Sequence, residues 1–193
     1  MTPAPAPARP RPTQADLDAA RDRAIPDVIA AGLRVLFAGI NPGLYSAATG
    51  YHFARPGNRF WPALHRSGFT ERVFRPDEQE RLLGLGLGIT NIVARATARA
   101  DELRPEEFLA GARILNAKIA RFQPRWLAVV GVTAYRAAFG RRGAGVGPQG
   151  ETIGETQVWV LPNTSGLNAH YVGLKLVEAF RELRQAEQYG DRP

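Results

Sequence analysis

Two asparagine-containing turns carry the side chains that are best placed for chemistry. Asn41-Pro42-Gly43 follows the apolar run Val35–Ile40, and Asn163–Leu167 follows the apolar run Gln157–Leu161. An asparagine amide can orient a water molecule through its carbonyl oxygen, but it does not titrate and cannot serve as a strong general base. The proline restricts the asparagine before it, and the glycine lets a ligand approach the backbone closely. Chemistry at the first turn would rest on positioning, although Asn-Pro-Gly is also a common structural turn.

The composition excludes several other kinds of site. The chain of 193 residues has no cysteine and three histidines, His52, His65 and His170. A disulfide scaffold, a zinc–thiolate site, an iron–sulfur cluster and a cysteine nucleophile are excluded, and we expect no metal or other cofactor. The apolar runs are too short to span a bilayer, and no secretory signal is evident. We expect a cytoplasmic protein without a membrane partner, and a monomer, because no long apolar seam suggests an obligate partner.

The charge favours a polyanionic partner. The formal net charge is +7, and only two of the 25 basic residues are lysines, which leaves 23 arginines. Arginine grips phosphate groups bidentately, so a pI near 10.5 makes nucleic acid the first partner to consider. Arginine can also replace lysine through genomic base composition, with the basic surface merely solvated. Both interpretations stay open on charge alone.

The hydrophobic pattern divides the chain into a tail and one domain. Residues 1–13 are rich in proline and predict an extended, disordered tail, and residues 14–193 predict a single domain. Apolar patterning predicts strands at Val35–Ile40, around Gly88–Thr90, at Trp126–Gly131 and at Gln157–Leu161, the last paired with Glu151–Ile153. Start signals and apolar periodicity predict helices at Gln14–Ala31 (limited by Pro26), Asn58–Arg66, Pro76–Leu83, Pro105–Phe122, Thr133–Phe139 and Leu174–Gln188. The glycine-rich segment Arg141–Gly150 predicts a flexible loop.

Strands that alternate with helices predict an α/β fold. The expected architecture is a three-layer sandwich, with a central, mostly parallel sheet flanked by helices. In such sheets ligands bind at the carboxyl ends of the strands, which is where both asparagine-containing turns lie. A small-molecule nucleotide enzyme is the least favoured occupant of this layout, because no GxGxxG or P-loop motif follows a strand.

Three stretches of the chain together resemble a known family. They are GINPGLYSAATGYHFARPGNRFW (39–61), GLGITNIVARAT (86–97) and WVLPNTSGLN (159–168). In order and spacing they are similar to the mismatch-specific uracil/thymine DNA glycosylases, within the uracil-DNA glycosylase superfamily, and the likeness extends over about Val35 to Gln185. The resemblance implies a uracil-DNA glycosylase-like fold whose DNA groove lies at the carboxyl ends of the strands.

The resemblance also implies an activity and a partner. The expected enzyme is a monofunctional hydrolase that flips uracil out of mismatched double-stranded DNA and cleaves its N-glycosidic bond, which starts base-excision repair. Duplexes with G·U or G·T mismatches are the expected partners, with thymine and other damaged pyrimidines as further substrates. The setting would be the bacterial cytoplasm, at the nucleoid.

Site residues follow from the resemblance, position by position. Asn41 corresponds to the asparagine that positions the attacking water, and Phe53 to the aromatic residue beneath the flipped base. The loop that enters the DNA corresponds to Gly166, Leu167, Asn168, Ala169 and His170, with Leu167 as the wedge. This loop departs from the family at Thr164 and Asn168, where proline and serine are usual. Further base contacts are expected from Ile40, Ser46, Asn91 and Asn163.

Other charged and polar residues allow two interpretations each. Asn91 either lines the pocket or caps a turn, and we favour the pocket. A catalytic role for Asp101 or Glu102 is not expected. Candidate phosphate contacts, each of which is otherwise a solvated surface arginine, are Arg55, Arg59, Arg95, Arg141 and Arg142.

Two alternatives to the expected function stay open. The first is a glycosylase whose main substrate is another modified pyrimidine, such as an ethenocytosine. The second is a weakly catalytic protein that binds DNA lesions or abasic sites.

Overall fold

The sheet of this protein has five strands, of which four are parallel. The computed structural model describes residues 11–166 and 173–189. In the sheet, β1 (Val35–Gly39) lies between β2 (Leu87–Asn91) and β3 (Trp126–Val130). Next to β3 lies β5 (Thr156–Leu161), and β4 (Gly147–Ile153) pairs antiparallel with β5 at the edge. The fold class predicted from the sequence is confirmed.

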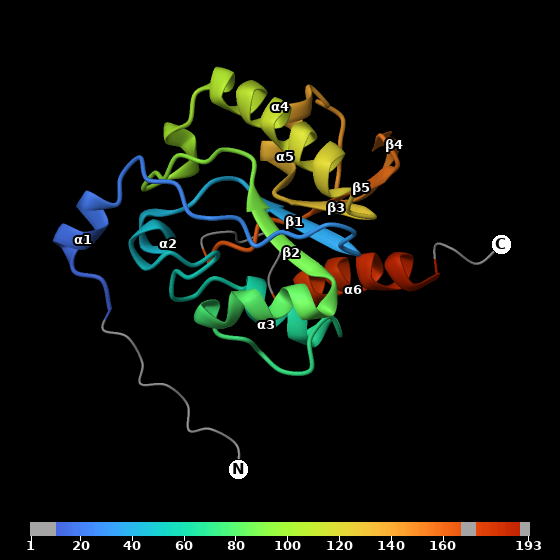
Figure 1. Ribbon diagram of the computed structural model, residues 1–193, viewed down its shortest axis with the longest axis horizontal. Helices are drawn as coiled ribbons and strands as arrows, with labels where there is room; N and C mark the ends of the chain where they lie inside the picture. Colours follow the sequence, from blue (N-terminus) through green and yellow to red (C-terminus); the bar gives the residue numbers. More distant parts are fainter. Residues whose placement is uncertain (1–10, 167–172, 190–193) are drawn as a thin grey trace, which may run out of the picture.

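Helices cover both faces of the sheet (Figure 1). One face carries α4 (Pro105–Phe122) and α5 (Val132–Phe139), and the other carries α3 (Phe60–Arg66) and α6 (Leu174–Tyr189). Because successive strand residues point to opposite faces, β1 contributes to two cores. Phe37 packs with Phe60 and Phe180 on the α3–α6 side, whereas Leu36 packs with Leu115 on the α4–α5 side. All five residues of β1 are buried, which explains its uninterrupted apolar sequence.

The strand register places the ends of the parallel strands together. Gly39, the last residue of β1, is opposite Asn91, the last residue of β2, and Val130 of β3 is opposite Leu161 of β5. The residues that follow these strands therefore emerge at one edge of the sheet.

The first segment differs from the sequence-based prediction. The helix expected over residues 14–31 ends much earlier, because α1 spans only Gln14–Ala19. Thr13, which was assigned to the tail, is the N-cap of α1. After α1 the chain leaves the helical conformation, and Val28 exchanges two backbone hydrogen bonds with Ile89 at 2.9 and 2.8 Å. This bridge to the edge of the sheet competes successfully with a helical conformation. The first ten residues of the expected tail lie outside the described residues.

Further differences concern short elements. Helix α2 (Leu44–Thr49) was not predicted; it starts directly after Asn-Pro-Gly and ends at Gly50, whose φ is +79°. The helix expected at Pro76–Leu83 is the 3₁₀ helix η1 (Pro76–Leu85), and a second 3₁₀ turn, η2, spans Ala100–Glu102.

The glycine-rich segment expected to be a loop becomes a strand at Gly147. The predicted pairing across the Gly154-Glu155 turn is confirmed, since Thr152 pairs with Gln157 and Ile153 with Thr156. A register shift between Pro148 and Thr152 interrupts this edge strand, where proline is tolerated. No helix within residues 11–166 and 173–189 is long and apolar enough to cross a membrane.

Candidate active site

A cavity of about 730 Å³ lies at the carboxyl edge of the parallel strands. Residues that follow β1, end β2, and follow β3 and β5 all contribute to its wall. The residue predicted to position the attacking water, Asn41, lines this cavity. So do all the residues predicted to contact the base: Ile40, Ser46, Phe53, Asn91 and Asn163. The fold therefore brings together side chains that are more than 120 residues apart in the sequence.

The amide of Asn41 is held in one orientation. Its Nδ2 donates hydrogen bonds to the backbone oxygen of Arg95 and to Oγ1 of Thr97, both at 2.8 Å. Because the Thr97 hydroxyl donates its own proton to the Arg99 carbonyl at 2.7 Å, it acts as the acceptor toward Asn41. Both partners of Nδ2 are acceptors, which fixes the nitrogen and oxygen positions of the amide. The Oδ1 oxygen is the part of the amide that can accept a hydrogen bond from a molecule in the cavity.

The segment that supplies these acceptors wraps around the Asn41 turn. Val93 N donates to Ile40 O at 2.9 Å, and Thr97 N donates to Pro42 O at 3.1 Å. These hydrogen bonds tie the segment after β2 to the turn after β1. The position of Asn41 thus depends on two strands and not only on its own turn.

Ion pairs fix the same segment from outside. The Arg95 guanidinium pairs with Glu107 on α4 at 2.7 Å and with Asp22 at 3.0 Å. The hydrogen bonds from Arg95 hold the pKa of Glu107 at about 2, and those carboxylates in turn raise the pKa of Arg95. Arg95 was a candidate phosphate contact, but its charge is engaged with two carboxylates and its carbonyl oxygen positions Asn41.

His52 orients the second asparagine of the site. The residue is 1% exposed, and burial lowers the pKa of His52, which keeps the ring neutral at pH 7. Nε2 lies 2.9 Å from the carbonyl oxygen of Pro26, which can only accept, so Nε2 carries the proton. Nδ1 is then the acceptor for Nδ2 of Asn91 at 3.3 Å. The amide of Asn91 consequently directs Oδ1 away from His52.

Gly39 leaves the space in which Asn91 and Phe53 meet. A Cβ atom at Gly39 would lie 2.6 Å from Oδ1 of Asn91 and 3.2 Å from Cζ of Phe53. Phe53 has a positive φ of 52°, a conformation that aromatic residues rarely adopt. Its ring stacks on Phe60, with the centroids 4.0 Å apart and the planes within 16°. The strained backbone and the stacking partner hold a flat ring at the cavity wall.

The hydroxyl of Ser46 completes this part of the cavity. Ser46 is buried on α2, and its Oγ accepts a hydrogen bond from Ala54 N at 3.2 Å. The hydroxyl proton can still be donated to a molecule in the cavity. Ile40, from the neighbouring turn, lines the same space.

The turn after β5 forms the opposite wall. Asn163 Oδ1 accepts from Ser165 N at 2.9 Å, which stabilises the turn, and Arg59 N donates to Thr164 O at 3.0 Å. The guanidinium of Arg59 donates to Ser165 O at 2.5 Å. A Cβ at Gly166 would lie 3.0 Å from the carbonyl oxygen of Gly57, so the two segments are closely packed. Leu167, Asn168, Ala169 and His170 lie outside the described residues.

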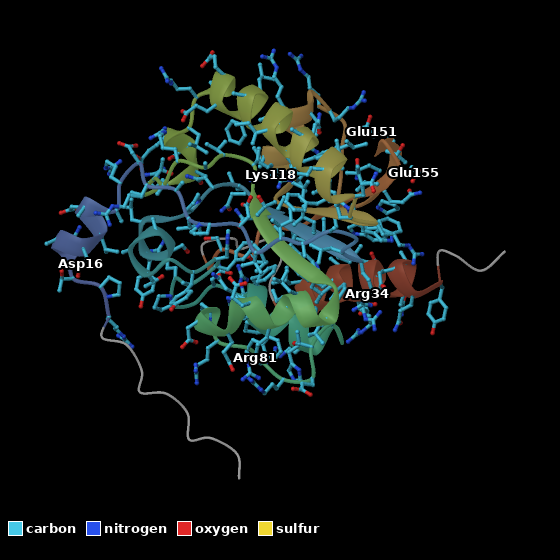
Figure 2. All side chains as sticks on the ribbon, in the orientation of Figure 1. Asp16, Arg34, Arg81, Lys118, Glu151 and Glu155 are labelled. Atoms are coloured by element: carbon cyan, nitrogen blue, oxygen red, sulfur yellow. The ribbon has the colours of Figure 1, made fainter. Side chains whose placement is uncertain are left out.

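Of the remaining candidate phosphate contacts, two lie at the cavity or support its wall, and two lie away from it. Arg55 is exposed and lines the cavity, whereas the half-buried Arg59 supports the turn after β5. Arg141 and Arg142 come after the eight-residue helix α5. The first residues of this helix line the cavity, and the rest of it leads the chain away from the cavity. Arg141 pairs with Glu151 on β4, at the side of the molecule labelled in Figure 2. Neither Arg141 nor Arg142 lines the cavity.

Several cavity-lining residues were not assigned a site role from the sequence. Among them are His52, Thr97, Arg99 and Asp101, for the last of which no catalytic role was expected. His52 and Thr97 lie within the motif stretches, so their positions were available as a signal. Arg99 and Asp101 carried no signal beyond their charge. In residues 11–166 and 173–189, no group of three or more His, Asp or Glu residues could hold a metal ion.

The fold and the site define an α/β protein with a polar cavity at the carboxyl edge of its sheet. A family model of the Uracil DNA glycosylase superfamily matches residues 26–186. The chain therefore belongs to the Uracil DNA glycosylase superfamily, which supports DNA glycosylase activity and DNA binding.

A solved structure shares the fold. It is the solution NMR structure of a candidate uracil DNA glycosylase from Methanosarcina acetivorans, similar to this chain with a TM-score of 0.56 and 19% sequence identity. The match covers 84% of this chain and 98% of that one. At this identity the likeness concerns the fold alone.

Proposed function

We propose that this protein removes uracil from mismatched double-stranded DNA by hydrolysing the N-glycosidic bond. The observation that carries the proposal is the fixed orientation of the Asn41 amide. Because Nδ2 makes both hydrogen bonds to the protein, Oδ1 is the atom that can accept a hydrogen bond from a water molecule in the cavity. In the proposed step the oxygen of this water bonds to C1′, and the bond from C1′ to N1 breaks. Its electron pair leaves with the base as a uracil anion, and the proton that the water loses passes through solvent to this anion. The products are free uracil and an abasic sugar.

The proposed reaction rests on positioning because Asn41 cannot act as a strong base. Water held by a rigid acceptor reaches C1′ only when the sugar lies in the cavity, which requires the nucleotide to leave the helix. A rigid geometry of this kind supplies rate by orientation, and a small misplacement can cost about 100-fold. The two hydrogen bonds of Nδ2 and the ion pairs of Arg95 provide that rigidity.

The proposed recognition of the base uses Phe53 and Asn91. The ring of Phe53, stacked on Phe60, offers its other side to a flat pyrimidine. Oδ1 of Asn91 suits a base that carries a proton on N3, as uracil and thymine do. Cytosine has a lone pair at N3 and would oppose the lone pairs of Oδ1, leaving a buried acceptor unsatisfied. The site should therefore reject cytosine, while it accepts uracil.

The wedge role of Leu167 remains part of the proposal. The turn before it is fixed by the contacts of Arg59 with Thr164 and Ser165. A rigid stem lets a loop enter DNA without losing its position. Leu167→Ala should weaken the capture of an extruded base, and equal affinity of the wild-type protein for damaged and undamaged duplex would argue against base flipping.

A panel of duplexes tests the proposed substrate. The purified protein is assayed under single-turnover conditions on G·U, A·U and G·T pairs, on uracil in single-stranded DNA and on a duplex with ethenocytosine. The proposal expects release of uracil from G·U at a rate well above the control without enzyme. Faster release of ethenocytosine than of uracil would assign another main substrate, and no release above the control would favour a lesion-binding protein.

A further inference from the structure

An arginine outside the motif residues stands at the rim of the cavity. Arg99 lines the same cavity as Asn41, and 73% of its side chain is exposed. Its guanidinium pairs with Asp101, which is also exposed and lines the same rim. Exposed ion pairs contribute little to stability, so the fold has little need of this one.

The backbone of Arg99 is fixed even though its side chain is exposed. Its carbonyl oxygen accepts from the Thr97 hydroxyl at 2.7 Å and from Glu102 N at 3.2 Å. Its N–H donates to a carboxylate oxygen of Glu102 at 2.8 Å, and that carboxylate is itself paired with Arg21. A fixed backbone reduces the entropy lost when the side chain binds a ligand.

The chain also places an arginine on the other side of the cavity. Residues 53–59, which include Arg55, lead into α3, whereas residues 97–104, which include Arg99, lead into α4. Helices α3 and α4 cover opposite faces of the sheet (Figure 1). Arg55 also lines a small neighbouring cavity of about 130 Å³ next to Ser165 and Gly166. The two exposed arginines therefore line one cavity and belong to segments that lead into opposite layers.

We propose that Arg99 binds a DNA backbone phosphate beside the flipped nucleotide, on the side of the cavity opposite Arg55. This inference rests on the proposed function, because it takes DNA as the ligand. A base stacked on Phe53 leaves its sugar near Asn41 and its two flanking phosphates outside the base pocket. Arg99 lies one hydrogen bond beyond Thr97, the partner of Asn41. These hydrogen bonds hold the backbone of Arg99 close to Asn41, and its side chain lines the same cavity, so its guanidinium is within reach of a phosphate beside the sugar. The guanidinium can bind that phosphate by donating two N–H groups.

Asp101 has the opposite effect in this proposal. In the free protein its carboxylate holds the guanidinium of Arg99 at the rim. When DNA binds, the phosphate competes with the carboxylate for the guanidinium and is repelled by its charge. The two residues should therefore give opposite changes in DNA affinity when each is neutralised.

The test measures equilibrium binding of the full chain to a duplex that carries a stable abasic-site analogue, over a range of salt concentrations. Each phosphate contact adds about 0.9 to the slope of log K against log salt concentration. Arg99→Gln should lower that slope by about 0.9, which corresponds to roughly eightfold weaker binding at about 0.1 M salt. Asp101→Asn should bind more tightly than the wild type. Arg113→Gln is the matched control with the same loss of charge, because Arg113 is exposed on α4 and does not line the cavity.

A second readout separates phosphate binding from a role in the reaction. At saturating enzyme, single-turnover release of uracil from a G·U duplex should be the same for Arg113→Gln and the wild type, and it should not be slower for Asp101→Asn. A reduced rate for Asp101→Asn would assign it as a catalytic base and overturn the proposal. So would an Arg99→Gln variant whose salt slope equals that of Arg113→Gln. If the wild type binds the duplex with the abasic-site analogue but releases no uracil from a G·U duplex, the proposed function fails while the binding assay still decides on Arg99.

Discussion

The substitution Gly39→Ala gives a sharp test of how the base pocket is built. The new Cβ would lie 2.6 Å from Oδ1 of Asn91, whereas carbon and oxygen atoms approach each other to about 3.3 Å. The amide must then move by about 0.7 Å. Its hydrogen bond to His52 is already 3.3 Å long and would not survive that movement in most directions. The ring of Phe53, at 3.2 Å, would be displaced as well.

The fold should tolerate this change better than the activity does. Overpacking of a core typically costs about 1–3 kcal/mol, and the lower end applies because the atom met is the end of a side chain. For a domain of this size, about 1 kcal/mol lowers Tm by roughly 2–4 °C. Loss of a base contact that leaves a buried polar group unsatisfied costs about 1–3 kcal/mol. Since 1.36 kcal/mol is a factor of ten, kcat/KM for uracil release should fall roughly 5- to 150-fold.

The assay compares kcat/KM on a G·U duplex with the melting temperature of the same preparations. Gly84→Ala is the matched control, because a Cβ at this exposed position meets no atom within 4 Å. In an Asn91→Ala background the effect of Gly39→Ala on kcat/KM should shrink, since the colliding amide is gone. Wild-type kcat/KM for Gly39→Ala would refute the role given to the Asn91 amide and the Phe53 ring.

Three further outcomes are expected. Thr97→Val removes one hydrogen-bond acceptor of the Asn41 amide, so single-turnover release of uracil should slow roughly tenfold while the DNA affinity stays the same. An unchanged rate would show that Thr97 does not help to position Asn41 for the reaction. Glu107 has a pKa of about 2 in the folded protein and its ordinary value of 4.5 in the unfolded chain. Its contribution to the free energy of unfolding is therefore lost as the pH falls from 4.5 toward 2. In acid titrations Glu107→Gln should flatten this loss, and an identical profile would contradict the ion pair with Arg95. Because the pKa of His52 is lowered in the folded protein, the unfolded chain binds a proton at this residue more readily, and the free energy of unfolding should fall as the pH drops below 6.5. His52→Gln should remove this pH dependence. A pH dependence that persists in the variant would have to come from another group.

Buried strands and the long helix were predictable because their signals are local. The run Val35–Ile40 is apolar throughout since β1 is covered on both faces. Pro105 followed by two acidic residues marked the start of α4, which spans Pro105–Phe122 as predicted. In such segments the residues that fix the element are adjacent in the sequence.

The early end of α1 and the strand β4 were not predictable in this way. The chain is not helical around Val28 because Val28 pairs with Ile89, a partner 61 positions away. Gly147 and Pro148 have low strand propensity, and only pairing with β5 makes them part of the sheet. Tertiary contacts outweigh local preference in both cases.

The candidate site was also predictable only in part. Asn41, Phe53 and Asn91 were placed at the site by motifs and by the rule that ligands bind at the carboxyl ends of strands, and the structure brings all three to one cavity. The orientation of the Asn41 and Asn91 amides was not predictable. That of Asn41 depends on Thr97, and that of Asn91 depends on His52, whose protonated nitrogen is set by the Pro26 carbonyl. These partners are 26 to 56 positions away from the residues they orient.

Arginines were the least predictable group. Charge and a glycine-rich neighbourhood pointed equally to Arg55 and to Arg141. Helix α5, about 12 Å long, separates Arg141 from the cavity and brings it to Glu151. Arg99 was not singled out, because nothing in the local sequence shows that residues 97–101 fold over the turn of Asn41.

The most direct test of the central claim is single-turnover release of uracil from a G·U duplex by the wild-type protein and by Asn41→Ala, each at saturating enzyme. Loss of the acceptor that positions water should slow release about 100-fold or more while the affinity for the duplex stays the same. Thermal unfolding of both proteins controls for the fold. An Asn41→Ala variant that releases uracil as fast as the wild type would contradict the account, as would a wild-type protein that releases none.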